Sequence, residues 1–175
     1  MAKALVVTDM LNGFCHPDGS MYCGEGVEAL VDSIEKKVRQ YHMNGDRVIF
    51  VCDRHKKNDK EFNFSTPHCI QGTWESEVVD KIKGAIVKHD WVVPKTRYSA
   101  FYGSIAMERA LEDINPTECE VVGVCTNLCI LYTVEELRNR DYHVYVDRNY
   151  VMAFDNEAHL WALKQMKESF GVEIL

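Results

Sequence analysis

The sequence predicts an α/β protein in which a six-stranded, mostly parallel, doubly wound sheet carries helices on both faces. Short apolar runs alternate with longer segments of helical periodicity along the whole chain, which is the pattern of a parallel sheet with helical crossovers. The links between these segments are short. No repeat, low-complexity tract or Pro/Gly/Ser-rich linker divides the 175 residues, so we expect residues 1–175 to form a single domain.

Six short apolar runs predict the strands, because buried parallel strands are read as nearly continuous apolar segments. In chain order they span residues 3–8, 47–52, 85–88, 119–124, 142–146 and 172–175. The run at 119–124 (CEVVGV) is short and apolar except for Glu120, so we expect that strand to be buried.

Helical periodicity is clearest after the first strand, where one face is apolar and Asn44-Gly45 gives a stop signal. The apolar face consists of Val27, Leu30, Val31, Ile34, Val38 and Tyr41. Weaker patterns predict helices at 75–82, 104–114, 126–140 with Thr126 as the cap, and 155–170 with Asp155 as the cap.

Composition limits the classes of partner and compartment. Acidic and basic residues are interspersed and the net charge is -7, so we expect neither nucleic acid nor an anionic membrane as a partner. The chain has no apolar run of about 18 residues and starts directly with a strand pattern, which predicts a cytoplasmic protein. Seven cysteines without a close CxxC pair favour reduced thiols.

Reactive side chains follow the predicted strands at their carboxyl ends, which is where doubly wound sheets bind ligands. Asp9 follows the first strand, Asp53 and His55 the second, Lys95 the third and Cys129 the fourth. Each residue also has an ordinary interpretation: a turn residue for Asp9, a surface histidine for His55 and a solvated charge for Lys95.

Cys129 is placed in the first turn of the helix predicted at 126–140. Unpaired N–H groups and the helix dipole stabilise a thiolate there, so we expect the pKa of Cys129 to fall below about 8.5 and the thiol to act as a nucleophile. The alternative is a small buried hydrophobic residue.

The loop at 53–73 carries the ligand set of a catalytic divalent metal with open positions. Asp53 and His55 lie on the same side of an extended segment, His68 adds a second imidazole, and Glu61 offers another oxygen. Competing ligands nearby are Asp59, Cys69 and His89.

Four ordered segments of the chain resemble the isochorismatase-like cysteine hydrolase superfamily, and among its members most closely the nicotinamidases. They are ALVVTDMLNGF, DRH with the following EFNFSTPHCIQGT, KTRYSAF and GVCTNLCILYT. The resemblance covers essentially the whole chain and implies the six-stranded parallel sheet with helices on both sides.

The resemblance also implies the roles of individual residues. It assigns a catalytic triad of Asp9, Lys95 and Cys129, and metal ligation by Asp53, His55 and His68, with Glu61 as a ligand found in only some members. It further implies a cis peptide bond before Cys125, whose backbone N–H would form the oxyanion hole with that of Cys129.

The function that the resemblance implies is a metal-dependent cysteine amidohydrolase that converts nicotinamide into nicotinate and ammonia through a thioester, a step of NAD salvage. It implies one divalent metal ion, zinc with manganese or iron as alternatives, and a homo-oligomer. Phe14, Tyr98 and Trp74 are candidates for an aromatic wall around a flat ring, with core packing as the alternative for Trp74.

Departures from the family pattern leave the triad intact. Asn127 stands where many nicotinamidases have Asp, and Cys125 stands where a small residue is common. Alternative functions are hydrolysis of another small amide or ureido compound, and an isochorismatase-type reaction, against which the metal loop argues. A non-catalytic thiol or metal-binding module on the same scaffold is disfavoured by the intact triad.

Overall fold

A seven-stranded sheet forms the centre of the computed structural model, which describes residues 2–175. The strands are β1 (Ala4–Thr8), β2 (Arg47–Asp53), β3 (Trp91–Lys95), β4 (Cys119–Val124), β5 (Val144–Val146), β6 (Val151–Met152) and β7 (Glu173–Ile174). Six of them follow the order β3-β2-β1-β4-β5-β7, and all pairings between these strands are parallel. The predicted doubly wound sheet is therefore confirmed.

The strand that the sequence did not predict, β6, consists of two residues beside the end of β4. β5 pairs with the first two residues of β4, Cys119 and Glu120, whereas β6 pairs with the last two, Gly123 and Val124. β6 therefore continues the sheet where β5 has already ended.

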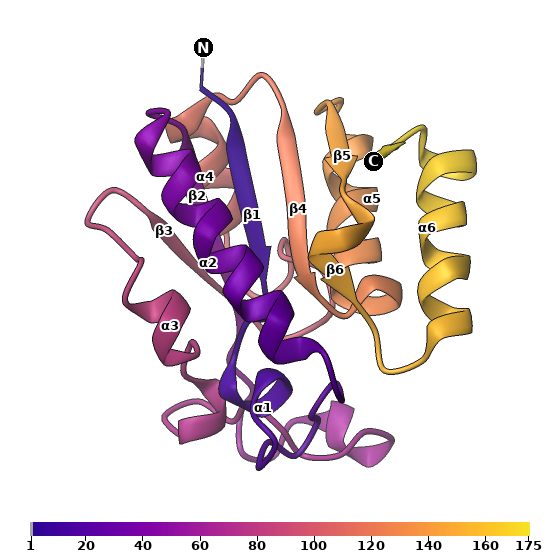
Figure 1. Cartoon of the computed structure of the whole chain (residues 1–175). Coiled ribbons are helices and arrows are strands. Elements are labelled where there is room, and N and C mark those ends of the chain that lie inside the picture. Colours follow the sequence, from indigo (N-terminus) through magenta and orange to yellow (C-terminus); the bar gives the residue numbers. More distant parts are fainter. Residues whose placement is uncertain (1) are drawn as a thin grey trace.

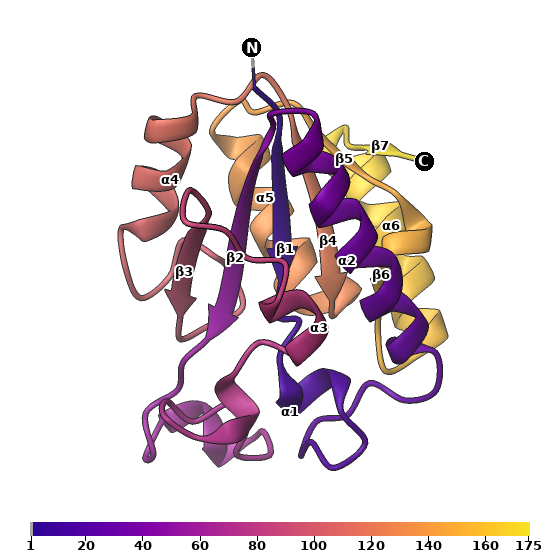
Figure 2. The same cartoon turned by 60° about the vertical axis from the view of Figure 1, so that its left-hand side comes forward.

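Helices cover both faces of the sheet (Figures 1 and 2). One face packs against α2 (Val27–Met43) and α3 (Asp80–Lys83), and the other against α4 (Ala106–Ile114), α5 (Leu131–Asn139) and α6 (Asn156–Phe170). Alternate residues of β1 serve the two layers, because successive side chains of a strand point to opposite faces. Leu5 and Val7 join the α2 layer, while Ala4 and Val6 join the layer of α4, α5 and α6.

Two helix boundaries agree with the sequence signals. α2 ends at Met43, and Gly45 follows with a φ of 77°, a left-handed conformation that glycine adopts without steric cost. The carboxylate of Asp155 accepts a hydrogen bond of 2.8 Å from the N–H of Ala158 and caps α6 as predicted.

The prediction of a third strand at 85–88 is wrong, since β3 comprises Trp91–Lys95. β3 lies at the edge of the sheet, so its side chains alternate between exposed and buried, and Pro94 is tolerated there. This strand therefore lacks the continuous apolar run that identifies the central strands.

The helix predicted at 75–82 is also wrong in extent. Only the 3₁₀ turn η2 (Trp74–Ser76) and the short α3 form there, because Val78 between them makes an antiparallel bridge with Leu11. This bridge joins the segment to the chain that leaves β1.

The helix predicted at 126–140 has a different start. It begins as a π-helical segment, η3 (Thr126–Ile130), that continues into α5, and its N-cap is Cys125. Thr126 does not cap it, because its hydroxyl shares a hydrogen bond of 2.9 Å with Nδ1 of His159 on α6.

The carboxyl ends of β1, β2, β3 and β4 point to the same end of the molecule (Figures 1 and 2). The direction of winding reverses between β1 and β4, which creates a crevice at that end. The short elements α1 (Asn12–Cys15) and η1 (Lys60–Asn63) belong to this end together with η2, whereas η4 (Arg148–Tyr150) directly precedes β6.

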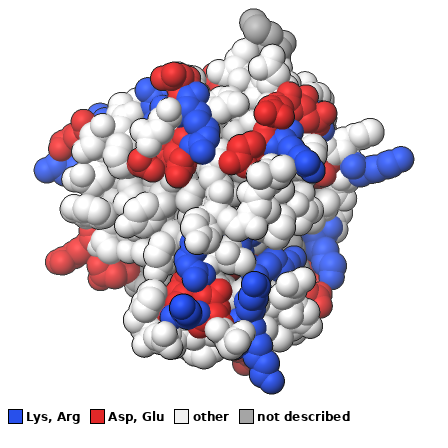
Figure 3. Space-filling view, turned by 180° about the vertical axis from the view of Figure 1, so that it is seen from behind, with Lys and Arg blue, Asp and Glu red and all other residues white. Residues whose placement is uncertain are grey.

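Acidic and basic side chains are interspersed on the face shown in Figure 3. Within residues 2–175, no helix combines the length and the apolar character that crossing a membrane requires.

Candidate active site

Three side chains from three different strand ends meet at the crevice. Asp9 follows β1, Lys95 is the last residue of β3, and Cys129 lies in η3 after β4. Nζ of Lys95 lies 2.8 Å from Oδ2 of Asp9 and 3.3 Å from Sγ of Cys129, and it also contacts Oδ1 of Asp53. All four residues are buried, so the sheet places one cation between two carboxylates and a thiol.

Asp9 is held by the neighbouring strand β2. Its backbone has a φ of 53°, a conformation that Asp tolerates better than most residues, and its N–H donates to the carbonyl of Val51 over 2.9 Å. Its Oδ1 accepts a hydrogen bond of 2.9 Å from the N–H of Asp53. The orientation of the Asp9 carboxylate is therefore fixed from two sides.

The two carboxylates have opposite shifts in pKa. Burial and the neighbouring charge of Asp53 raise the pKa of Asp9 to about 6, against the opposing effect of Lys95. Burial also opposes the charged form of Asp53, but Lys95, His55 and His68 outweigh it and hold the pKa of Asp53 well below its usual range. Asp9 is thus the carboxylate that can exchange a proton near neutral pH.

The prediction of a lowered pKa for Cys129 is wrong. Burial of the sulfur, together with the charges of Asp9 and Asp53, raises the pKa of Cys129 well above its ordinary value, although Lys95 acts in the other direction. The start of a helix stabilises a thiolate only modestly, and here desolvation outweighs it. The thiol is therefore protonated at rest, and its use as a nucleophile would require a base that removes the proton.

The segment around Cys125 has an irregular backbone at the end of β4. The peptide bond between Val124 and Cys125 is cis. In η3, the N–H of Ile130 donates to the carbonyl of Cys125, which is the first bond of the i→i−5 type. The N–H of Cys129 lies before this bond, among the groups at a helix start that lack an intrahelical partner.

A second cluster adjoins the first through Asp53. Asp53, His55 and His68 each offer one ligand atom, and these atoms all lie within 4.8 Å of one another. Oδ2 of Asp53 is 3.6 Å from Nε2 of His55 and 3.7 Å from Nε2 of His68. Both imidazoles therefore direct the same nitrogen toward one carboxylate oxygen.

The donor set fits a divalent metal ion. The Nδ1–H of His55 donates to Oδ2 of Asp59 over 3.1 Å, and that of His68 donates to the carbonyl of Thr66 over 2.7 Å. In such tautomers Nε2 carries the free lone pair that a metal needs, and Nε2 of His55 is buried without a hydrogen-bond partner among residues 2–175.

Glu61 lies at the edge of this cluster. Its Oε2 is buried and is 3.7 Å from Nη1 of Arg97, but Glu61 does not belong to the group of atoms within 4.8 Å. It faces the same pocket as Asp53 and His68. The structure thus brings Glu61 near the predicted metal ligands while pairing it with an arginine.

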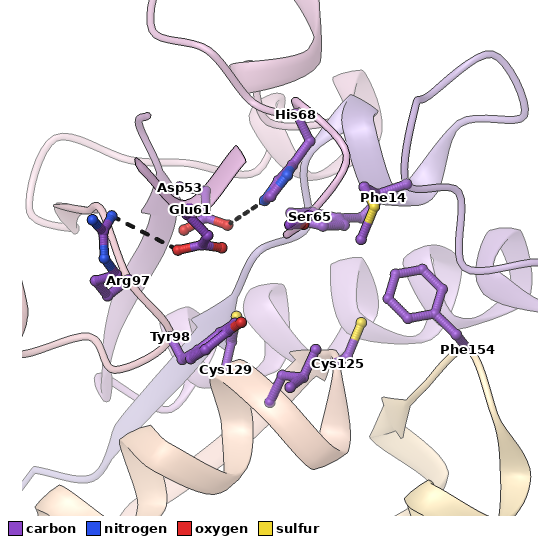
Figure 4. A pocket seen from close by; sticks show the side chains of 12 residues that line it. Phe14, Asp53, Glu61, Ser65, His68, Arg97, Tyr98, Cys125, Cys129 and Phe154 are labelled. Atoms are coloured by element: carbon purple, nitrogen blue, oxygen red, sulfur yellow. Dashed lines mark ion pairs between the residues drawn. The ribbon is translucent and has the colours of Figure 1, made fainter. Parts of the chain in front are cut away.

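A pocket of about 420 Å³, including its open mouth, joins the two clusters (Figure 4). Asp53, Glu61 and His68 form one side, and the sulfur atoms of Cys125 and Cys129 lie on another.

Two of the three predicted aromatic residues line this pocket. Phe14 packs edge-on against His68 at 5.5 Å, and Tyr98 stacks on Tyr132 at 5.7 Å. Trp74 does not reach the pocket. It is 46% exposed, packs against His16 and lines a separate cavity. A hydrogen bond from the side chain of Asn12 to the Trp74 carbonyl ties η2 to α1 beside that cavity.

The sequence analysis did not identify several other residues of the pocket wall: Met21, Ser65, Arg97, Leu128 and Phe154. Leu128 had a detectable signal, because it directly precedes Cys129. The remaining four lie in irregular segments, where neither periodicity nor spacing indicates the direction in which a side chain points.

Comparisons with known proteins agree with this geometry. The sequence profile of the isochorismatase domain matches residues 3–174. The chain is 32% identical to the isochorismatase family protein PncA of Bacillus subtilis, over 99% of either chain. The crystal structure of the nicotinamidase/pyrazinamidase PncA of that organism superposes with a TM-score of 0.91, also over 99% of each chain.

Two further structures cover nearly the whole chain. The pyrazinamidase of Pyrococcus horikoshii in complex with zinc has 25% identity and a TM-score of 0.89, with 100% of this chain and 99% of that chain covered. The N-carbamoylsarcosine amidase of Thermoplasma acidophilum has 26% identity and a TM-score of 0.87, with 99% and 95% covered. These relatives confirm the predicted enzyme class, hydrolases of amide C–N bonds. The chain belongs to the isochorismatase family of hydrolases.

Proposed function

We propose that the chain is a metal-dependent cysteine amidohydrolase that converts nicotinamide into nicotinate and ammonia through a thioester. The observation that carries this proposal is the pocket in which Cys129 faces a group of two imidazoles and a carboxylate. Such a pocket can hold a pyridine ring at one end and its carboxamide at the other. The similarity to the nicotinamidase/pyrazinamidase of Bacillus subtilis supports the same substrate.

In the proposed mechanism, Asp9 acts as the base. Its pKa of about 6 leaves it ionised at neutral pH and still able to accept a proton from the neutral thiol of Cys129. Lys95 lies 3.3 Å from the sulfur and stabilises the thiolate as it forms. The thiolate then attacks the carboxamide carbon.

The oxyanion that results is bound by the backbone N–H groups of Cys125 and Cys129, each worth roughly 3 kcal/mol in comparable sites. Asp9 returns its proton to the amide nitrogen, the C–N bond breaks, and ammonia leaves behind a thioester on Cys129. A water molecule, deprotonated by Asp9, then attacks the thioester carbon. Nicotinate leaves and the thiol of Cys129 is restored.

Asp53, His55 and His68 would hold the divalent metal, with Glu61 beside them. Zinc, manganese and iron suit this donor set, and the zinc complex of the Pyrococcus relative favours zinc. When bound, the ion supplies a Lewis acid that attracts the ring nitrogen of a pyridine and so orients the substrate.

Phe14 and Tyr98 would contact the faces or edges of the flat ring, since aromatic side chains favour such contacts. We further propose a role in NAD salvage, a homo-oligomeric state and a cytoplasmic location. The location is supported by seven cysteines that all remain free in the fold.

The test is an ammonia-release assay with nicotinamide, pyrazinamide, N-carbamoylsarcosine and a ureidoacrylate, a pyruvate-release assay with isochorismate, and metal analysis of the purified protein. We expect the highest kcat/KM for nicotinamide and about one metal ion per chain. If kcat/KM is instead highest for a ureido compound, that compound replaces nicotinamide as the proposed substrate. The similarity to the Thermoplasma amidase raises this possibility. If none of these compounds is turned over, the remaining function is that of a non-catalytic binding module.

A further inference from the structure

We propose that Asp59 is a positioning residue that orients the metal ligand His55 and couples it to Arg97 in the pocket wall. This inference rests on the metal site of the proposed function and extends it beyond the residues that touch the ion.

Asp59 lies on the opposite side of the His55 ring from Asp53. It accepts a hydrogen bond of 3.1 Å from Nδ1, whereas Asp53 faces Nε2 at 3.6 Å. The two nitrogens of an imidazole point in different directions, so Asp59 cannot share an ion with Asp53 and Nε2 of His55. The sequence analysis considered Asp59 as a competing ligand. In the structure Asp59 instead contacts the proposed ligand His55 and would not touch the ion.

The carboxylate of Asp59 is fixed from three directions. Its Oδ1 accepts a hydrogen bond of 3.0 Å from the N–H of Glu61 and thereby caps η1. Nη1 of Arg97 lies 2.9 Å from Oδ1 and 3.0 Å from Oδ2. The side chain is only 6% exposed, so these contacts determine its orientation and thereby the tilt of the His55 ring.

His55 and His68 differ in how they are oriented. The partner of Nδ1 in His68 is a backbone carbonyl, that of Thr66, whereas the partner in His55 is a charged side chain. A carboxylate makes the imidazole a more basic ligand than a carbonyl does. Asp59 thus tunes one of the two imidazoles, and substitution can remove its effect without changing any ligand.

Arg97 extends this contact to the pocket. Its side chain is 36% exposed and lines the pocket, and Nη1 contacts both Asp59 and Glu61. The contacts run from the pocket wall through Arg97 and Asp59 to His55. A ligand that displaces Arg97 would therefore alter the orientation of a metal ligand.

The test measures the affinity of the full chain for Zn²⁺ by competition with a chromogenic chelator. We expect Asp59→Ala to weaken zinc binding by about 10- to 100-fold, the range for substitutions behind a metal ligand. Asp59→Asn keeps a good N-cap for η1 and a neutral acceptor for Nδ1, so we expect an intermediate loss of several-fold. The visible absorption spectrum of the Co²⁺-loaded protein should differ from that of the wild type more in Asp59→Ala than in Asp59→Asn.

Asp90→Ala is the matched control. Asp90 also pairs with a histidine, at 2.9 Å from Nε2 of His42, and also accepts a backbone N–H, that of Val87, but it lies at the other end of β3. This variant should lose stability and keep the zinc affinity of the wild type.

The outcomes separate this inference from the proposed function. Unchanged zinc affinity in Asp59→Ala would overturn the inference. Wild-type affinity in Asp59→Asn alone would show that the charge of Asp59 does not tune His55, which also overturns it. If the wild type binds no zinc, the proposed metal site and this inference fail together. If the zinc affinity of the chain depends on Asp59 but the wild type does not hydrolyse nicotinamide, only the proposed reaction fails.

Discussion

Nζ of Lys95 lies 3.3 Å from Sγ of Cys129, with both groups buried at the base of the pocket. The same ammonium pairs with the carboxylates of Asp9 and Asp53. Burial disfavours its charge, but these anions outweigh that effect and raise the pKa of Lys95 well above its ordinary value. A permanent cation therefore holds together the proposed base, the proposed nucleophile and a proposed metal ligand.

Replacing Lys95 by Met should damage both stability and turnover. Two buried carboxylates would lose their cation, which costs about 3–5 kcal/mol of unfolding free energy. We expect kcat/KM for nicotinamide to fall by about 10³-fold, because the pKa of Asp9 rises further and the thiolate loses its stabilisation. Urea unfolding and steady-state kinetics measure the two effects.

The control for this variant is Lys37→Met, which removes the partner of the buried Glu120 and should destabilise the fold without lowering kcat. Equal kcat values for Lys95→Met and the wild type would remove Lys95 from the mechanism.

The two cysteines of the pocket should respond differently to substitution. Cys129→Ala should abolish turnover while the fold and the metal content stay intact, because the acyl group then has no acceptor. Cys125→Ala should keep kcat within a few-fold of the wild type, because its proposed contribution is a backbone N–H. Ammonia release and circular dichroism check both variants, and substantial amidase activity in Cys129→Ala would exclude it as the nucleophile.

His68→Ala should lower the zinc content and raise the KM for nicotinamide together. The variant leaves two of the three donors in the cluster, and the ion that orients the substrate would then be weakly held. Elemental analysis after dialysis gives the stoichiometry. His143→Ala removes a histidine whose side chain is 57% exposed and should change neither quantity; normal zinc content in His68→Ala would contradict the ligand assignment.

His159 should make the stability of the fold depend on pH. Burial and Arg148 lower the pKa of His159 in the folded state, so the unfolded chain takes up this proton first as the pH falls below about 6.5. The stability that neutral His159 provides is therefore present above that pH and lost below it. Because glutamine does not titrate, the advantage of the wild type over His159→Gln should shrink between pH 8 and pH 5 in urea unfolding. A constant difference across this range would show that the shift has no energetic effect.

The sequence predicted the central strands well because they are buried on both faces. β1, β2 and β4 are nearly continuous apolar runs, whereas the edge strand β3 alternates between exposed and buried residues and contains Pro94. Asp9, Asp53 and Cys129 could be placed together because the ends of parallel strands converge. Lys95 was also placed at this edge, although the strand that carries it was predicted too early in the chain.

Other properties of the site depend on distances that no local pattern encodes. The pKa of Cys129 is set by burial and by carboxylates from two other segments, so its position at a helix start gave the wrong direction. Trp74 and Phe154 are both partly exposed aromatic residues outside regular strands, but only Phe154 faces the pocket. Which of the two aromatic residues reaches the pocket depends on the path of the loops that carry them.

The two oxygens of Asp53 face different neighbours: Oδ1 contacts Lys95, and Oδ2 faces His55 and His68. A substitution at this position would disturb the proposed ion binding and the charge balance beside the proposed nucleophile at once. A relative that dispenses with the metal could therefore discard both histidines and still be obliged to keep the aspartate. In this scaffold, loss of the histidines rather than of the aspartate is the sequence change that would mark a lineage as metal-free.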